Sequence, residues 1–300
     1  MTNRRALRVA LASCADHPGF VAGGNEALVA RLRELDIHAE LAVWTDPAVD
    51  WSAYDATLIR TTWDYTSRLA EFRSWMRHVE AVGQLFNPSR LCEPNLEKEY
   101  LRRLGDAAVP TVWLRAAADD AAVESALDEA ARRGWETLAV KPTVAAAAEG
   151  LLVAPVSERA KLRMHIRKIG RDRGVMVQPL IETIRTRGEL SVVLIEGEPS
   201  HAVRKTPTDG ELRCQIEYGG AYEVESPGAA ALGAVERASV LWRDEPSPPL
   251  YARVDLLEPE ADLYKIIEVE LVEPELFFRW SPAGARRFGE ALRRRLAGTR

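Results

Sequence analysis

Three carboxylates near the end of the chain carry the clearest chemical signal. Glu268 and Glu270 stand two residues apart in an apolar run, so on a strand their side chains point to the same face. Asp255 ends a second run, Tyr251–Asp255, that reads as a neighbouring strand. Carboxylates that converge repel one another unless a cation joins them, and Mg²⁺ prefers hard oxygen ligands that it shares with nucleotide phosphates. We expect these three residues to hold Mg²⁺; the alternative is three solvated acids on a polar strand face.

Cationic side chains come from several other predicted elements. Lys98 begins a helix, Lys141 ends a strand, and later strands carry Arg204, Lys205 and Arg213. Lysine and arginine neutralise phosphate oxygens, while a metal bridges the phosphates to carboxylates. Together with the acids, this set predicts a site for ATP. The chain has no GxxxxGK[ST] loop and no kinase HRD or DFG motif, which excludes a Walker-type or protein-kinase site.

The composition is that of an ordinary soluble protein. The chain has 300 residues, 47% of them hydrophobic, and a net charge of -5, which argues against nucleic-acid binding. No apolar stretch approaches a membrane span, and no signal-peptide core is visible. The three cysteines, Cys14, Cys92 and Cys214, have neither metal-ligand spacing nor an even number. We therefore expect a cytoplasmic protein without nucleic-acid or membrane partners.

The chain begins with a β-α-β-β pattern. Strands are predicted over residues 7–13, 39–44 and 54–60, with a helix over 25–35, which indicates a small α/β lobe with a mostly parallel sheet. The loop at residues 60–65 follows the third strand, where open α/β sheets bind ligands.

This loop is the candidate substrate-binding element. Arg60 suits a substrate carboxylate, Asp64 suits an amino group, and Thr61 lies between them, so an amino-acid-like substrate is expected. The equally weighted alternative is a helix start capped by Asp64 or Thr66, with Trp63 and Tyr65 packing below it.

Two further α/β units follow a boundary near residue 94. Asn95 is the expected N-cap of the next helix, and Gly197 is expected in the turn of a hairpin. The predicted domains are 1–94, 95–183 and 184–300. The further predicted strands lie at 111–114, 138–141, 174–181, 188–194, 200–205 and 213–218, with helices at 119–133, 158–169 and 228–242.

Taken in order, these motifs resemble the ATP-grasp superfamily, and most closely its glutathione-synthetase-like and RimK-like ligases. The resemblance spans residues 90 to 282 and implies an α/β (α+β) fold: an N-terminal pre-ATP-grasp lobe, followed by two lobes that clasp ATP. The matching segments are Asn95–Leu101, Ala139–Pro142, Val177–Ile181, Gly188-Glu189, Ser200–Lys205, Arg213 with Gly219-Gly220, Asp255 and Glu268–Glu270.

The resemblance also implies roles for individual residues. Lys98 and Lys141 would contact the phosphates, Glu189 the ribose, and Arg204 the γ-phosphate or acyl phosphate. Arg213 would face the substrate and intermediate, and the residues implied in catalysis are Lys141, Arg204 and Arg213. The adenine hinge would be Gln178, Pro179, Leu180 and Ile181; the amides of Gly219 and Gly220 would assist Arg213; and Asp255, Glu268 and Glu270 would hold one or two Mg²⁺.

Two segments depart from the family pattern. Glu270 stands where relatives often have asparagine, and a carboxylate there still binds Mg²⁺. Residues 143–150, TVAAAAEG, replace the Ser/Gly-rich loop that covers the phosphates in relatives. Alanine keeps the N–H donors but restricts the backbone, so a different lid closure is expected.

The activity implied is that of an ATP-dependent carbon–nitrogen ligase. Such ligases form an acyl phosphate from a small amino-acid-like substrate, and a nitrogen nucleophile then displaces phosphate. The resemblance favours intramolecular closure of O-ureido-D-serine to D-cycloserine, an antibiotic-biosynthetic step; it leaves open a peptide-bond-forming ligase, a small-molecule kinase and a degenerate ATP-binding protein. A homodimer is favoured by analogy with relatives.

Overall fold

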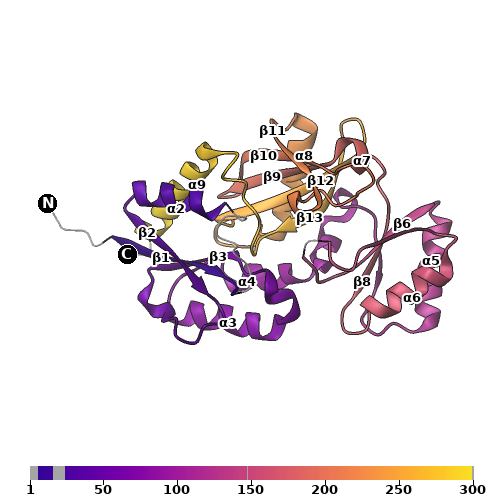
Figure 1. Cartoon of the computed structure of the whole chain (residues 1–300), viewed down its shortest axis with the longest axis horizontal. Coiled ribbons are helices and arrows are strands. Elements are labelled where there is room, and N and C mark those ends of the chain that lie inside the picture. Colours follow the sequence, from indigo (N-terminus) through magenta and orange to yellow (C-terminus); the bar gives the residue numbers. More distant parts are fainter. Residues whose placement is uncertain (1–5, 16–23, 147, 299–300) are drawn as a thin grey trace.

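The structure is a computed structural model that describes residues 6–15, 24–146 and 148–298. Three sheets follow one another along the chain (Figure 1). The N-terminal lobe and the lobe built on β6 and β8 lie at opposite ends of the view, and the C-terminal sheet lies between and above them (Figure 1).

The first sheet is parallel, with the order β2-β1-β3-β4. Its inner strands β1 and β3 are buried on both faces, as parallel strands usually are: Val9 and Leu11 of β1 face one core, while Ala10 and Ala12 face another. The elements are β1 (Leu7–Ser13), α2 (Asn25–Glu34), β2 (Ile37–Val43), β3 (Ala56–Thr61), α3 (Leu69–Val82), β4 (Leu85–Phe86) and α4 (Ser89–Cys92), with short 3₁₀ helices η1 (Trp51–Ala53), η2 (Trp63–Ser67) and η3 (Glu93–Leu96).

The central sheet is antiparallel, with the order β5-β8-β6-β7. Leu138 and Val140 of β6 pack under the two helices of this lobe, so Ala139 and Lys141 point to the opposite face and line a cavity. The elements are η4 (Lys98–Ala107), β5 (Val112–Leu114), α5 (Asp120–Arg132), β6 (Thr137–Pro142), β7 (Leu152–Pro155), α6 (Arg159–Ile169) and β8 (Val175–Pro179).

The C-terminal sheet is antiparallel, with the order β11-β10-β9-β12-β13. Glu196 and Gly197 both adopt positive φ angles, 55° and 80°, in the two-residue turn between β9 and β10, which confirms the predicted hairpin. The elements are α7 (Ile184–Arg187), β9 (Glu189–Ile195), β10 (Glu198–Thr206), η5 (Ile216–Tyr218), β11 (Ala221–Glu225), α8 (Ala229–Arg237), η6 (Ala238–Leu241), β12 (Tyr251–Glu260), β13 (Leu263–Glu270) and α9 (Pro282–Gly298).

Two local predictions are wrong. Asn95 does not cap a helix: its side-chain amide donates to Val269 O at 2.8 Å and its carbonyl accepts from Leu271 N at 2.8 Å, so it ties this segment to β13. The next helix begins at Lys98 instead. Residues 213–218 form a loop ending in a 3₁₀ turn, and the strand follows at Ala221–Glu225.

The hydrophobic cores do not follow the predicted boundaries along the chain. Helix α9 lies against α2, and Phe288 and Leu292 share a core with Leu28 and Leu32. Helix η4 packs beneath the C-terminal sheet through Leu101. The last helix therefore belongs to the core of the first lobe, although it was assigned to the third domain. Among the helices described, none is long and apolar enough to cross a bilayer.

Asn87 connects the N-terminal lobe to the C-terminal sheet. The residue is fully buried; its side-chain amide donates to Tyr251 O and Leu271 O at 2.8 Å, and its side-chain carbonyl accepts from Leu250 N at 2.8 Å. These bonds satisfy three backbone groups that lie away from water.

Removing this side chain should therefore destabilise the whole molecule. We expect Asn87→Ala to lower the free energy of unfolding by at least ~2 kcal/mol, because buried polar groups lose their partners. Ser67→Ala, which removes an exposed hydrogen bond to Asp64 O, is the control and should cost less than ~0.5 kcal/mol. Denaturant titration of both variants measures the difference; equal losses would refute the bridging role of Asn87.

Candidate active site

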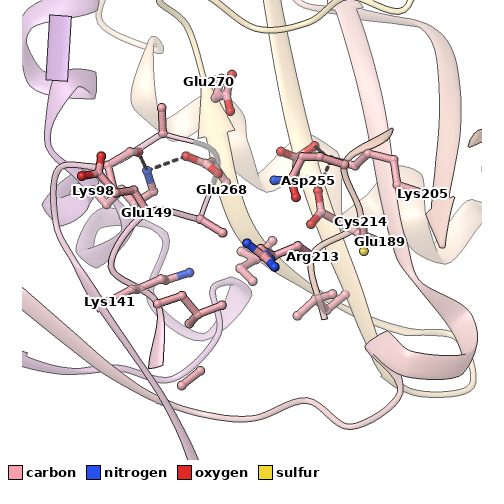
Figure 2. A pocket seen from close by; sticks show the side chains of 18 of the residues that line it. Lys98, Lys141, Glu149, Glu189, Lys205, Arg213, Cys214, Asp255, Glu268 and Glu270 are labelled. Atoms are coloured by element: carbon pink, nitrogen blue, oxygen red, sulfur yellow. Dashed lines mark hydrogen bonds and ion pairs between the residues drawn. The ribbon is translucent and has the colours of Figure 1, made fainter. Parts of the chain in front are cut away.

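A cavity of about 580 Å³ lies where the three lobes meet. The N-terminal lobe contributes Trp63 and Tyr65, and the central lobe contributes Lys98 and Lys141. The strands of the C-terminal sheet contribute its acidic wall, as Figure 2 shows for Glu189, Asp255, Glu268 and Glu270. The volume is typical of a small-molecule site.

The three predicted metal ligands converge. Asp255 of β12 pairs directly with Glu268 of β13, and Glu270 follows two residues later on the same face. One carboxylate oxygen from each lies within 4.8 Å of the others. Asp255 is buried, so the alternative of three solvated acids does not hold for this residue. Oxygen ligands at this spacing suit a hard divalent cation such as Mg²⁺.

Arg253 lies inside this cluster and is the feature that the sequence interpretation missed. Its Nη2 atom lies 2.8 Å from Asp255 Oδ2 and 2.5 Å from Glu270 Oε1. Arg253 stands two residues before Asp255 on β12, so strand alternation places both on one face. Side chains two residues apart on a strand share a face, and this alternation, which predicted the acids, also predicts that Arg253 lies beside Asp255.

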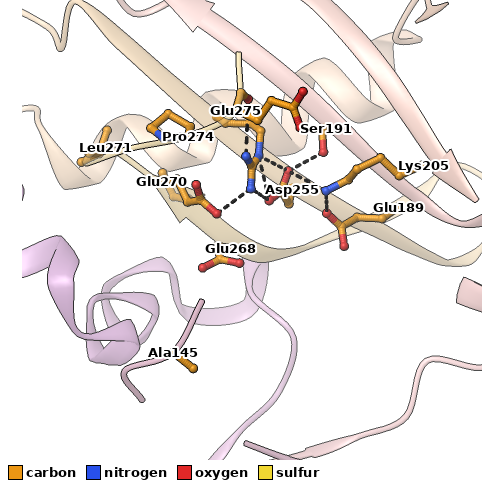
Figure 3. A network of polar contacts seen from close by, with 12 residues as sticks. Ala145, Glu189, Ser191, Lys205, Asp255, Glu268, Glu270, Leu271, Pro274 and Glu275 are labelled. Carbon is orange, nitrogen blue, oxygen red and sulfur yellow. Dashed lines mark hydrogen bonds and ion pairs between the residues drawn. The ribbon is translucent and has the colours of Figure 1, made fainter. Parts of the chain in front are cut away.

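Two lysines add further positive charge to the acidic wall of the cavity. Lys98 Nζ lies 2.8 Å from Glu268 Oε1 and also donates to Ala145 O at 2.9 Å. Lys205 forms an ion pair with Glu189 and lies 3.8 Å from Asp255 Oδ1 (Figure 3). Cations from β10, β12 and η4 thus offset part of the negative charge of the acidic wall.

The pKa values divide the acids into two groups. Burial opposes ionisation of Asp255, but the positive charges of Arg253 and Lys205 outweigh it and lower its pKa to about 2. Burial raises the pKa of Glu270 to about 7, despite Arg253, and raises that of Glu273 to about 8, with Glu270 adding to the effect. Positive charge is therefore deficient beside Glu270 and Glu273, which is where a bound cation would be stabilised.

Lys141 stands at the end of β6, pointing into the cavity (Figure 2). Burial lowers its pKa to about 8. No described carboxylate forms an ion pair with it, whereas Lys98 is held by Glu268 and has a raised pKa despite burial. Lys141 therefore offers an anion such as a phosphate a cationic site with no acid competing for it.

The predicted adenine hinge lines the cavity. Gln178 is buried and its side-chain amide donates to Thr111 Oγ1 at 2.8 Å, while Leu180 N donates to Thr137 O at 2.9 Å. Both groups are already bonded, so a base at this wall would need other backbone groups of the hinge. The hinge residues in the wall are Gln178, Pro179, Leu180 and Ile181.

Arg204 points away from the site. Its guanidinium makes two hydrogen bonds to Glu225, at 2.7 and 2.6 Å, and another to Arg187 O. Alternation along β10 puts the neighbouring Lys205 on the cavity side instead. This placement gives no support to the predicted γ-phosphate role of Arg204, and Lys205 is the cation of β10 that reaches the acidic wall.

The loop residues expected to bind substrate lie elsewhere. Arg60 is 1% exposed; its Nε donates to Asn25 Oδ1 at 3.2 Å and its Nη1 to Pro274 O at 2.9 Å. Thr61 is fully buried and donates to Ser13 Oγ at 2.8 Å. Asp64 accepts from Trp44 Nε1 at 2.7 Å. All three residues thus contact other parts of the protein and do not line the cavity. Trp63 and Tyr65 of the same loop do line it.

The loop after β10 reaches the cavity through Arg213. Its guanidinium lies over the Tyr218 ring, 3.6 Å from the centroid, and 2.5 Å from Glu211. Gly219 has a φ of +85°, and a Cβ on Gly220 would meet Cys214 O at 2.2 Å, so both glycines are required by the backbone. Their predicted contact with substrate is not needed to explain them.

The alanine-rich segment folds over the same cavity. Ala145, Ala146, Ala148 and Glu149 line it, and the left-handed φ of 58° at Ala148 marks a sharp turn. Ala147 lies outside the described residues. The segment occupies the place expected for a phosphate lid.

Comparisons with known proteins agree with this geometry. A family model for the N-terminal domain of D-cycloserine synthetase DcsG matches residues 9–87. Over 276 residues the chain is 29% identical to the cycloserine biosynthesis protein DcsG of Streptomyces lavendulae, covering 90% of this chain and 92% of that protein.

Solved structures extend the similarity over the whole fold. The crystal structure of D-cycloserine synthetase DcsG matches with a TM-score of 0.87 at 26% identity, covering 96% of this chain and 99% of that one. D-alanine–D-alanine ligase from Bacillus anthracis, complexed with ATP, matches with a TM-score of 0.67 at 15% identity over 98% of both chains. The predicted fold class is confirmed.

The raised pKa values make a prediction about stability. Glu270 and Glu273 have folded pKa values above the unfolded value of 4.5, so their contribution to stability is present at low pH and lost as pH rises through about 7 to 8. In chelator, we expect Glu273→Gln to melt at least ~2 °C higher than the wild type near pH 8 and level with it near pH 5. Thermal denaturation across this range checks it; a variant that melts lower at both pH values would contradict it.

Proposed function

Because this chain is an ATP-grasp ligase similar in sequence and structure to D-cycloserine synthetase DcsG, we propose that it closes O-ureido-D-serine to D-cycloserine at the expense of ATP. The observation that supports this proposal is the cavity that joins three convergent carboxylates to lysines from three other elements. The similarity to a cyclising ligase over nearly the full length of both chains supports the substrate.

Residues along the cavity wall fit the parts of an ATP molecule. The hinge at Gln178–Ile181 would hold the adenine and Glu189 the ribose, and Lys98, Lys141 and Lys205 would neutralise the phosphates. Lys98 contacts Ala145 O and Glu268, which leaves the third N–H of its ammonium group for a phosphate oxygen.

The carboxylate cluster fits a magnesium ion. Asp255, Glu268 and Glu270 would hold it, and such an ion supplies charge neutralisation on the phosphates during transfer. Arg253 holds two of these carboxylates in place, which fixes their spacing before any ligand arrives.

The proposed chemistry balances without a further co-reactant except water. The substrate carboxylate attacks the γ-phosphorus of ATP, giving an acyl phosphate and ADP. The nitrogen bonded to the side-chain oxygen then attacks the acyl carbon; the new C–N bond closes the ring, phosphate leaves and the nitrogen loses its proton. Water cleaves the carbamoyl group from the ring nitrogen, and D-cycloserine and carbamic acid are released.

Protein side chains act on this sequence by charge and position. Lys141 and Arg213 lie in the cavity wall and would stabilise the negative charge that develops on the transferring phosphoryl group and on the tetrahedral intermediate. Neither step calls for an activated serine or cysteine, and the described cysteines are buried with pKa values raised, by burial first, at Cys92 and Cys214. MgATP as co-substrate and three free thiols fit a reduced cytoplasm.

Coupled assays of ADP and phosphate test the reaction. With MgATP and O-ureido-D-serine alone, we expect ADP and phosphate in equal amounts together with D-cycloserine. A requirement for two amino compounds would instead indicate peptide-bond formation. ADP without free phosphate would indicate a kinase, and binding of ATP without turnover of any of these substrates would indicate a degenerate binder.

Turnover should depend on the metal cluster and on Lys141. We expect Glu268→Gln and Lys141→Ala each to reduce ATP turnover by at least ~10²-fold, as removal of one preorganised charge commonly does. Glu260→Gln makes the same substitution at an exposed position of β12 and should retain activity. Near-normal turnover by a folded Glu268 variant would refute the assignment of the cluster.

A further inference from the structure

Glu273 is a buried acid in the cavity wall that the nucleotide and metal sites do not use. The residue follows β13, is 7% exposed, and lines the same cavity as Trp63 and Tyr65. It stands three residues beyond Glu270, outside the group of three carboxylates whose oxygens converge.

Four acids on the strands of this wall, Glu189, Asp255, Glu268 and Glu270, each have a protein cation. Arg253 contacts Asp255 and Glu270, Lys98 contacts Glu268, and Lys205 contacts Glu189. In the part of the chain that the structure describes, no lysine, arginine or histidine forms an ion pair with Glu273. The hydroxyl of Tyr65 and the charge of Lys98 favour its ionised form, but burial and the neighbouring Glu270 outweigh them and raise its pKa to about 8.

A buried carboxylate without a cation is costly, and a ligand that supplies the cation would relieve this cost. The ligand expected here carries an α-ammonium group one carbon away from the carboxylate that is to be phosphorylated. Glu273 stands three residues after Glu270 of the metal cluster and beside the hydroxyl of Tyr65, and all three residues line one cavity. One amino acid bound there would direct its ammonium group to Glu273 and its carboxylate to the cluster.

We propose that Glu273 binds the α-ammonium group of the amino-acid-like substrate, with Tyr65 beside it and Trp63 closing the same end of the cavity. This assignment rests on the proposed function and replaces the expectation that Asp64 meets the amino group. Asp64 is bonded to Trp44 Nε1, away from this wall.

Arg60 is the positioning residue of this subsite. Its Nη1 donates to the carbonyl of Pro274, the residue after Glu273, and its Nε to Asn25 Oδ1. The guanidinium thereby fixes the backbone that carries Glu273 against β3 and α2. Arg60 was expected to bind a substrate carboxylate. In this assignment it holds the backbone next to Glu273, and Glu273 contacts the ammonium group.

Binding of substrate fragments separates this assignment from the overall reaction. Titration calorimetry would compare D-serine with 3-hydroxypropanoate, which lacks only the amino group, in the presence of Mg²⁺ and a non-hydrolysable ATP analogue. We expect the wild type to prefer D-serine by at least ~10-fold, the contribution of a charge-assisted hydrogen bond. Glu273→Gln should reduce this preference to near unity.

Asp64→Asn is the matched control, because it removes a charge while an amide oxygen can still accept from Trp44. It should keep the preference for D-serine. A preference that survives Glu273→Gln, one lost in Asp64→Asn, or none in the wild type would overturn the assignment. If the preference depends on Glu273 but O-ureido-D-serine is not turned over, the proposed reaction fails and the ammonium site stands.

Discussion

The arrangement of this molecule depends on placing Arg253 between Asp255 and Glu270. Acids packed this closely in a wall shielded from water would repel one another and resist ionisation. One guanidinium, two residues before Asp255 on the same strand, bonds to both of them. The remaining cations come from β10 and η4, so these elements must approach β12 and β13 for the acids to stay charged.

This electrostatic constraint also involves the alanine-rich segment. Lys98 donates to Ala145 O while it pairs with Glu268, so one ammonium group joins the segment to the acidic wall. Any ligand that draws Lys98 away from Glu268 also releases a bond that holds the segment. Glycine-poor sequence does not prevent such a lid, because alanine keeps its N–H donors and Ala148 adopts the left-handed turn that the path requires.

Strand periodicity and the order of motifs were sufficient to predict the carboxylate cluster and one lysine of the cavity. Asp255, Glu268 and Glu270 were found because residues two apart share a face, and Lys141 because it ends an alternating strand. Periodicity does not say which face of β10 meets the cavity, and the structure places Lys205, in place of the predicted Arg204, in the cavity wall. Arg60 was misjudged for a different reason: the backbone that buries it lies at Pro274, 214 residues further along the chain. Long-range burial of this kind leaves no local signal.

The distribution of cores explains why the two ends of the cavity differ. Strand β1, helix α2 and helix α9 share one apolar core with β9 and β12, so the N-terminal lobe cannot shift against the C-terminal sheet without breaking it. The helices of the central lobe pack on β6 and β8 in a separate core. Lys141 and the hinge therefore stand on a unit that can adjust with little loss of packing. Glu273, Tyr65 and Arg253 stand on the shared body, where positions are fixed.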